Sequence, residues 1–391
     1  KIRSFIKHAY DYVCSKNNSD IFSNEILENL EIPYYIDALK YCHFPSSDDY
    51  DISNANFELG RQRFVIEELL AYKLLLLDAK KIYESNKSHA FNISEDAIND
   101  FIVSLPFALT ASQKNAISDI KNSFLKSYPT KRLIQGDVGS GKTIIAVIAS
   151  YFSKLSNLQT GILVPTEILA DQHTNTFKKI FSGFPVKIEC LKSNLTPREK
   201  SRIIESVKSG DTDILIGTHS IIQDNVRFLN LGLIIVDEQH KFGINQRALL
   251  TLKNSENPSI PHELYLSATP IPRSLSLVLY EGLDYTIISE SPKNRKTINT
   301  QMIDHDKRSI LHDNISKILH DKEQVYWVCS CIDYTESSES EYVQGVYEDL
   351  SNRFATTSIG MLHGRVDSKE NIKTMKKFVS GEIQILVCTT M

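Results

Sequence analysis

The hydrophobic positions of the chain change their spacing near residue 105. Before that point, apolar side chains recur at helical intervals, most clearly over residues 57–85, where they predict one long helix. After it, short apolar runs alternate with helical patterns, as in a parallel sheet that helices cover on both faces. The strands predicted here are residues 161–165, 213–217, 233–236 and 263–267. The pattern therefore predicts a helical segment followed by an α/β domain.

A second run of the same rhythm begins after a polar link at residues 291–296. It predicts strands at residues 324–329, 358–362 and 384–388, separated by helices over residues 342–354 and 369–380. Three strands make a thin sheet, so we expect this second domain to be truncated. The expected division is a helical connector at residues 1–100, a first lobe at 101–290 and a truncated second lobe at 291–391.

Composition narrows the class of protein. Of the 391 residues, 41% are hydrophobic and 24% are charged, as in ordinary globular proteins. No apolar run is long enough to span a bilayer, and no N-terminal hydrophobic signal is present, so we expect a cytoplasmic protein without a membrane partner. The net charge of −4 means that contact with nucleic acid would need a local groove. The six cysteines lack metal-ligand spacing.

A glycine-rich turn lies between a short apolar strand and an apolar helix. Residues 136–143 read Gly-Asp-Val-Gly-Ser-Gly-Lys-Thr, which fits the pattern G-x-x-x-x-G-K-[ST]. Such a turn directs backbone N–H groups at a phosphate chain near the positive end of a helix. Lys142 is expected to reach the β- and γ-phosphates of ATP, and the Thr143 hydroxyl to bind Mg²⁺. The residues predicted to bind the nucleotide are Gly136, Asp137, Val138, Gly139, Ser140, Gly141, Lys142 and Thr143.

Two adjacent carboxylates end the apolar strand at residues 231–236. Function gathers at the carboxyl ends of parallel strands, so Asp237 is predicted to hold the hydration shell of Mg²⁺, and Glu238 to orient and deprotonate an attacking water. A solvated turn is the plain alternative. It does not explain why Asp237 follows Lys142 by 95 residues, a separation usual in two-lobed nucleic-acid motors.

Further polar residues are placed for recognition. The Gln113 amide, ahead of the glycine turn, matches both the donor and the acceptor of an adenine edge, although a surface helix position is the alternative. Thr166, Thr218 and His219 follow predicted strands, where they can bind a nucleic-acid backbone or simply cap loops.

The segment 267–273 ends another predicted strand, and two prolines fix its shape. Its polar residues are expected to couple the nucleotide to the second lobe by bonding to the carboxylates after residue 236. They are Ser267, Thr269 and Arg273.

In their order along the chain, these segments resemble the superfamily 2 helicases, whose fold pairs two RecA-like P-loop NTPase lobes. The resemblance narrows to the RecG branch-migration family. It rests on the glycine turn, on Asp-Glu-Gln-His-Lys-Phe-Gly at 237–243, on Ala-Thr-Pro-Ile-Pro-Arg-Ser-Leu at 268–275, on Pro-Thr-Glu-Ile-Leu-Ala at 165–170, and on Leu-His-Gly-Arg at 362–365.

The resemblance implies ATP- and Mg²⁺-dependent translocation on double-stranded DNA, with 3′–5′ polarity. It further implies remodelling of stalled forks and Holliday junctions in recombination and repair, by a monomer associated with the bacterial nucleoid. It adds Gln239 and His240 to the catalytic residues, and His363 and Arg365 to the DNA contacts.

Two departures from the family pattern matter. The family has an N-terminal wedge ahead of the segment that begins at Lys1 and motif arginines after the segment that ends at Met391, so we expect this chain to be a fragment that lacks both. Because a trans-lobe arginine stabilises the transition state, we expect this fragment to bind ATP but to hydrolyse it poorly.

Other classes of protein fit less well. A transcription-repair coupling factor motor usually has Asp-Glu-Glu-His where this chain has Gln239, and a DEAD-box RNA helicase has Asp-Glu-Ala-Asp. A passive DNA-binding remnant would be expected to lose Lys142, Thr143 and the paired acids. An ATP-driven transporter or chaperone would need neither residues 267–273 nor a second lobe.

Overall fold

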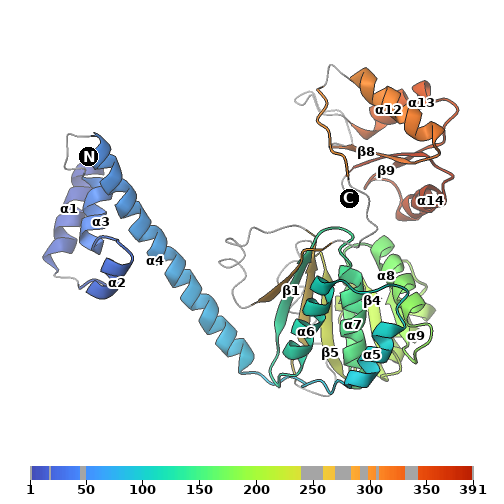
Figure 1. The fold of residues 1–391 in the computed structure, drawn as a ribbon, viewed down its shortest axis with the longest axis horizontal. Coiled ribbons are helices and arrows are strands. Elements are labelled where there is room, and N and C mark those ends of the chain that lie inside the picture. Colours follow the sequence, from blue (N-terminus) through green and yellow to red (C-terminus); the bar gives the residue numbers. More distant parts are fainter. Residues whose placement is uncertain are drawn as a thin grey trace. The chain divides into compact units, whose positions relative to one another are not determined.

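The computed structural model describes residues 2–16, 19–44, 50–238, 259–268, 283–290, 298–304, 308–330 and 342–389. Tertiary contacts divide the chain into two compact units, Lys1–Arg295 and Lys296–Met391. The elements of both units are drawn in Figure 1. The three-part division at residues 100 and 290 remains a prediction.

The first unit begins with helices α1 (Ile2–Ser15), α2 (Asn24–Asn29), α3 (Tyr35–His43) and α4 (Tyr50–Glu84). The long helix predicted over residues 57–85 is therefore present and begins earlier. Helix α3 approaches α4 so closely at Gly60 that a Cβ there would lie 2.8 Å from the Ala38 carbonyl oxygen. Phe22, Leu27 and Ile32 form a small core against Ile66 of α4.

A seven-stranded parallel sheet forms the rest of the first unit, in the order β3-β4-β2-β5-β6-β1-β7. All six neighbouring pairs are parallel, which confirms the predicted α/β class. The strands are β1 (Lys131–Gly136), β2 (Gln159–Leu163), β3 (Ile188–Leu191), β4 (Ile214–Gly217), β5 (Leu231–Asp237), β6 (His262–Ser267) and β7 (Asp284–Ile288). The helices around them are α5 (Glu95–Val103), α6 (Ala111–Phe124), α7 (Lys142–Leu155), α8 (Glu167–Ile180), α9 (Pro197–Lys208) and the 3₁₀ turn η1 (His219–Ile222).

The sheet has a hydrophobic core on each face. Successive strand residues point to opposite faces, so Leu133 and Ile134 of β1 belong to different cores, as do Ile234 and Ile235 of β5. Helix α7 fills the first core, with ten consecutive residues buried. Strand β5 is buried along its length apart from Asp237, the residue that ends it. The packing of these residues therefore fixes where β1 and β5 end along the strand direction.

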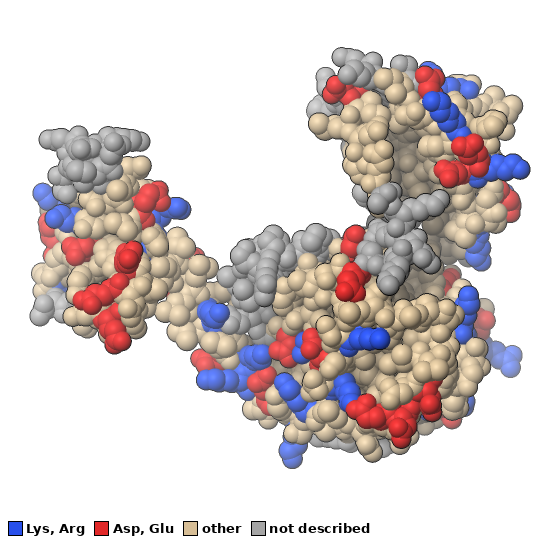
Figure 2. Space-filling model, viewed as in Figure 1, with Lys and Arg blue, Asp and Glu red and all other residues tan. Residues whose placement is uncertain are grey.

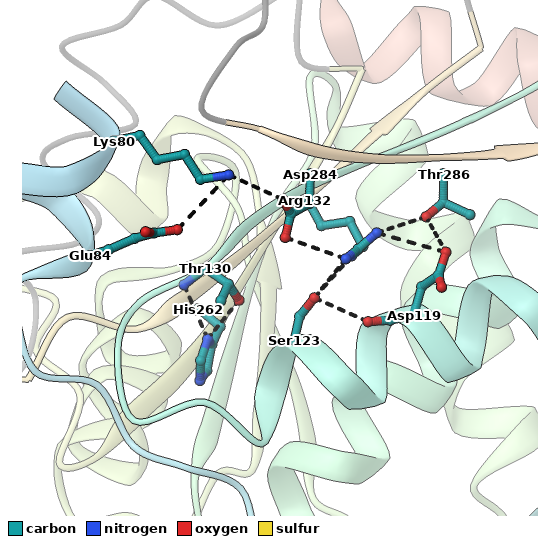
Figure 3. A network of polar contacts seen from close by, with 9 residues as sticks. All are labelled: Lys80, Glu84, Asp119, Ser123, Thr130, Arg132, His262, Asp284 and Thr286. Atoms are coloured by element: carbon teal, nitrogen blue, oxygen red, sulfur yellow. Dashed lines mark hydrogen bonds and ion pairs between the residues drawn. The ribbon is translucent and has the colours of Figure 1, made fainter. Parts of the chain in front are cut away.

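Polar contacts join the end of α4 to the sheet (Figure 3). Lys80 of α4 lies 3.4 Å from Asp284 of β7, which in turn lies 3.4 Å from Arg132 of β1. Arg132 also donates to Ser123 of α6 at 3.0 Å and to Thr286 at 2.9 Å. These contacts gather near the amino ends of β1 and β7, and the glycine turn follows the carboxyl end of β1.

The described part of the second unit contains the three strands that the sequence predicted, and they pair in parallel in the order β8-β10-β9. Its elements are α12 (Arg308–His320), β8 (Val325–Cys329), α13 (Val343–Arg353), β9 (Ile359–Leu362), α14 (Ser368–Val379) and β10 (Ile385–Thr389). A core around Trp327 and Val387 packs on one face, and one around Phe378 and Leu386 on the other. Among the residues described in both units, no helix is long and apolar enough to cross a membrane.

Candidate nucleotide-binding site

The glycine turn connects β1 to α7 in a conformation that needs glycine. Gly139 has a φ of 80° and Gly141, the residue before α7, has a φ of 89°, a left-handed conformation that side chains disfavour. A Cβ on Gly141 would also clash with the Gln113 side-chain nitrogen, and one on Gly136 with the Ser140 hydroxyl. The turn can therefore close tightly at the start of a helix, where N–H groups remain available to an anion.

The Lys142 side chain folds back into the turn. Its Nζ donates to the carbonyl oxygens of Gly136, at 2.7 Å, and of Asp137, at 3.0 Å. Burial lowers the pKa of Lys142 below its ordinary value, while the carboxylates of Asp237, Glu238 and Asp137 oppose that shift. The ammonium group therefore lies within electrostatic range of the two acids that end β5.

The two acids are held in a defined geometry. The Asp237 Oδ1 accepts a hydrogen bond from the Glu238 backbone N–H at 3.1 Å. The Asp237 Oδ2 lies 2.8 Å from Nε2 of His173, on helix α8. Glu238 has a φ of 53°, which is uncommon for a residue with a side chain and is often found at functional sites.

One cavity of about 360 Å³ brings the glycine turn and the acids together. Its lining residues are Val138, Gly139, Gly141, Lys142 and Thr143 from the turn, Asp237, Glu238 and Ala268 from strand ends, and Leu169, Gln172, His173 and Thr176 from α8. The register explains the juxtaposition, because β6 pairs with both β1 and β5. The carboxyl ends of these strands therefore meet at one edge of the sheet.

Gln113 bonds to the start of α6 and to the glycine turn. It is 4% exposed, its Oε1 accepts from the Thr110 backbone N–H at 2.9 Å, and its Nε2 donates to the Ser140 carbonyl at 2.8 Å. It is therefore a buried residue that caps α6 and braces the glycine turn, not a surface helix residue. An adenine contact stays a prediction.

Thr166 and Thr218, which were predicted to contact nucleic acid, both make local hydrogen bonds at the start of a helical turn. The Thr166 hydroxyl accepts from the Leu169 N–H at 3.3 Å and so caps α8. Thr218 precedes η1 and its carbonyl accepts from Ile221. His219 is exposed at the start of η1. Ser267 is buried at the end of β6, one residue beyond the register partner of Asp237.

The remaining predicted residues are distributed differently. Gln239, His240, Thr269 and Arg273 lie outside the described residues. His363 and Arg365 belong to the second unit, in the turn after β9, where the Asn371 side chain donates to the His363 carbonyl at 3.0 Å. The roles of all these residues stay predictions.

His173 is the site residue for which sequence reasoning gave no role. Two signals were present: the pair Gln172-His173 belongs to a segment that resembles the RecG family, and His173 lies four residues after Leu169 and three before Thr176, which places these three on one helix face. A face of this kind is normally assigned to packing, and only the fold brings it to Asp237.

A parallel α/β sheet with a phosphate-type glycine turn and paired acids at one edge defines a P-loop NTPase of the helicase class. Residues 110–278 match the DEAD/DEAH box helicase family. Over nearly its whole length the chain resembles the RecG family of these helicases, as the sequence predicted. It is 35% identical over 375 residues to the ATP-dependent DNA helicase RecG of Haemophilus influenzae, an alignment that covers 94% of this chain and 54% of that protein.

Two further comparisons agree. RecG of Bacillus subtilis is 34% identical over 392 residues, covering all of this chain and 56% of the relative. The structure of RecG bound to a three-way DNA junction has a TM-score of 0.77 and 33% identity, covering 96% of this chain and 48% of that one. The chain thus spans about half the length of the relatives that it matches.

Helicases of this family use ATP, usually with Mg²⁺, and the donor set of the cavity suits that metal. The described residues contain no cluster of three His, Cys, Asp or Glu side chains that would hold a metal by themselves. Among the residues that line the cavity, the Thr143 hydroxyl and the Asp237 carboxylate are the oxygen donors that would hold the metal, and they would be its only direct or water-mediated protein ligands. Mg²⁺ prefers such a sparse set of oxygen ligands, because it keeps several waters and takes the others from phosphates.

Proposed function

We propose that this chain is the ATP-driven motor of a DNA helicase of the RecG type, and that it acts on branched DNA. The observation that carries the proposal is the single cavity that Lys142 and Thr143 share with Asp237 and Glu238. The identity of 35% over nearly the whole chain to a protein named ATP-dependent DNA helicase RecG supports the DNA-directed part. The relative bound to a three-way junction supports branched DNA as the partner.

Each side chain of the cavity has a role in this proposal. The N–H groups of the glycine turn hold the β-phosphate, and Lys142 exchanges its bonds to Gly136 and Asp137 for bonds to phosphate oxygens. Thr143 and, through water, Asp237 hold Mg²⁺, which neutralises charge on the phosphates when it is bound. Glu238 orients the attacking water and accepts its proton.

The DNA contacts in this proposal lie at strand ends. Thr166, Thr218 and His219 supply them in the first unit, and His363 and Arg365 in the second. In the view of Figure 2, acidic and basic side chains are interspersed over the described surface of the first unit. Affinity for DNA would therefore come from local contacts and not from overall positive charge, in keeping with the net charge of −4. We further propose a monomer with 3′–5′ polarity.

Substitution of Lys142 tests the nucleotide site. We expect Lys142→Ala to weaken binding of a fluorescent ATP analogue by about 100-fold, because a charge-assisted bond contributes about 1.5–3 kcal/mol. The matched control is Lys154→Ala in the last turn of the same helix, where the ammonium pairs with Asp213 at 2.7 Å. This control should bind the analogue normally. Normal binding by a folded Lys142→Ala chain would refute the site assignment.

A further inference from the structure

His173 and Asp237 form a buried contact between a helix and the strand that ends at the site. The His173 Nε2 lies 2.8 Å from the Asp237 Oδ2, and the side chains are 7% and 13% exposed. An ionised carboxylate can only accept hydrogen bonds, so Nε2 carries the proton and donates it. The bond is therefore charge-assisted and shielded from water, which makes it stronger than an exposed contact.

The other ring nitrogen shows that packing alone does not explain this histidine. His173 Nδ1 is buried and has no hydrogen-bond partner among the described residues. A buried polar atom without a partner costs free energy, which an apolar side chain of similar size would avoid. In this structure the bond from Nε2 to Asp237 offsets that cost.

Two bonds fix the Asp237 carboxylate. Oδ1 accepts from the Glu238 N–H and Oδ2 accepts from His173, so rotation of the group would break both bonds. Each oxygen keeps acceptor capacity for a water molecule. The same carboxylate acts on Lys142, because it opposes the lowering of the lysine pKa by burial.

Helix α8 gives the histidine a fixed origin. Leu169, His173 and Thr176 all line the cavity, and Thr166 caps the helix two turns before His173. Next to this face, the buried Ala170 and Phe177 anchor the helix in the core of the first unit. We propose that His173 is a positioning residue that orients Asp237 for the hydrated metal, and so sets how much Mg²⁺ strengthens nucleotide binding. This inference rests on the proposed function and deepens it.

The test compares three substitutions at one position. In His173→Gln the amide nitrogen takes the place of Nε2, whereas in His173→Asn it takes the place of Nδ1 and cannot reach Asp237; His173→Ala removes both. Loss of a bond to a metal ligand typically costs 10–100-fold in metal affinity. We therefore expect Ala and Asn to reduce the gain in affinity on adding Mg²⁺ by about 10-fold, and Gln to restore most of it.

The assay is titration of the 391-residue chain with a fluorescent ATP analogue, once with Mg²⁺ and once with EDTA, beside a thermal melt of each variant. The inference predicts that affinity in EDTA is unchanged in all three variants. It is overturned if Asn retains the full Mg²⁺ effect, or if affinity falls equally with and without the metal, as a purely structural role requires. If His173→Ala does not fold, the Gln and Asn pair decides. Failure of the wild-type chain to bind the analogue would instead refute the proposed function.

Discussion

Removal of the buried arginine of helix α4 should release the helices that pack on it. The Arg63 side chain is 0% exposed, and its Nη2 lies 2.6 Å from both Asp20 and Glu67, whose side chains are 7% and 19% exposed. Its guanidinium also lies 4.2 Å from the centre of the Phe22 ring. Asp20 further accepts from the Tyr35 N–H, at the start of α3, at 2.7 Å. Arg63 therefore holds the segment before α2 and the start of α3 through one carboxylate.

The size of the effect follows from what Arg63→Ala leaves behind. Two largely buried carboxylates would lose their shared positive partner, and breaking a buried ion pair from one side costs about 3–5 kcal/mol. The matched control lies two residues away on the same helix. Arg61 pairs with Glu58 at 2.9 Å, but both side chains are more than half exposed. Arg61→Ala should therefore cost no more than about 0.5 kcal/mol.

Hydrogen exchange measured by mass spectrometry reports this region directly. For Arg63→Ala we expect amide protection over residues 19–44 to fall by at least about 100-fold, since 3 kcal/mol is about five times RT. Arg61→Ala should change it by about 2-fold at most. The chain's one tryptophan, Trp327, lies in the second unit, so its fluorescence should be the same in both variants. Equal protection in Arg63→Ala and Arg61→Ala would refute the reasoning.

Two further predictions concern the glycine turn and a buried histidine. Gly141→Ala should destabilise the first unit by at least about 1–2 kcal/mol and weaken analogue binding, because its φ of 89° is left-handed and a Cβ would displace Gln113. Thermal melts and titration with the analogue check this. The control is Gly183→Ala, where a Cβ has no neighbour within 4 Å. Burial lowers the pKa of His262 from 6.5 to about 4. Between these values the unfolded chain binds more protons, so the first unit should lose about 3 kcal/mol of stability as the pH falls from 6.5 to 4. Urea unfolding of the wild-type chain and of His262→Gln across that range measures how the free energy of unfolding changes with pH. If the variant showed the same pH dependence as the wild-type chain, His262 would not be its cause.

The interior strands were predictable because burial on both faces leaves an unmistakable apolar run. Strand β5 is such a run, and the sequence predicted it to within two residues. The edge strands of the first unit, β3 and β7, were not found, although those of the second unit, β8 and β9, were. β3 contains the half-buried Glu189 and Cys190, and β7 exposes 45% of Ile287, because a strand with one neighbour needs less apolar surface. Helix α12 in the second unit was missed as well.

The chemistry of the site was predictable only where it is local in sequence. Residues 136–143 and the pair at 237–238 are motifs of consecutive residues, so they can be recognised in the sequence. The bond from Gln113 to Ser140 joins residues 27 positions apart, and that between His173 and Asp237 joins residues 64 apart. No periodicity or motif specifies such contacts, because the crossover connections of the sheet bring these residues together.

A crystal structure of the chain with Mg²⁺ and a non-hydrolysable ATP analogue tests the central claim most directly. The predicted result has the β- and γ-phosphates within hydrogen-bond distance of Lys142 Nζ, with the metal beside the Thr143 hydroxyl and one water away from Asp237. A nucleotide bound elsewhere, or a metal that contacts neither Thr143 nor the hydration sphere of Asp237, would contradict it.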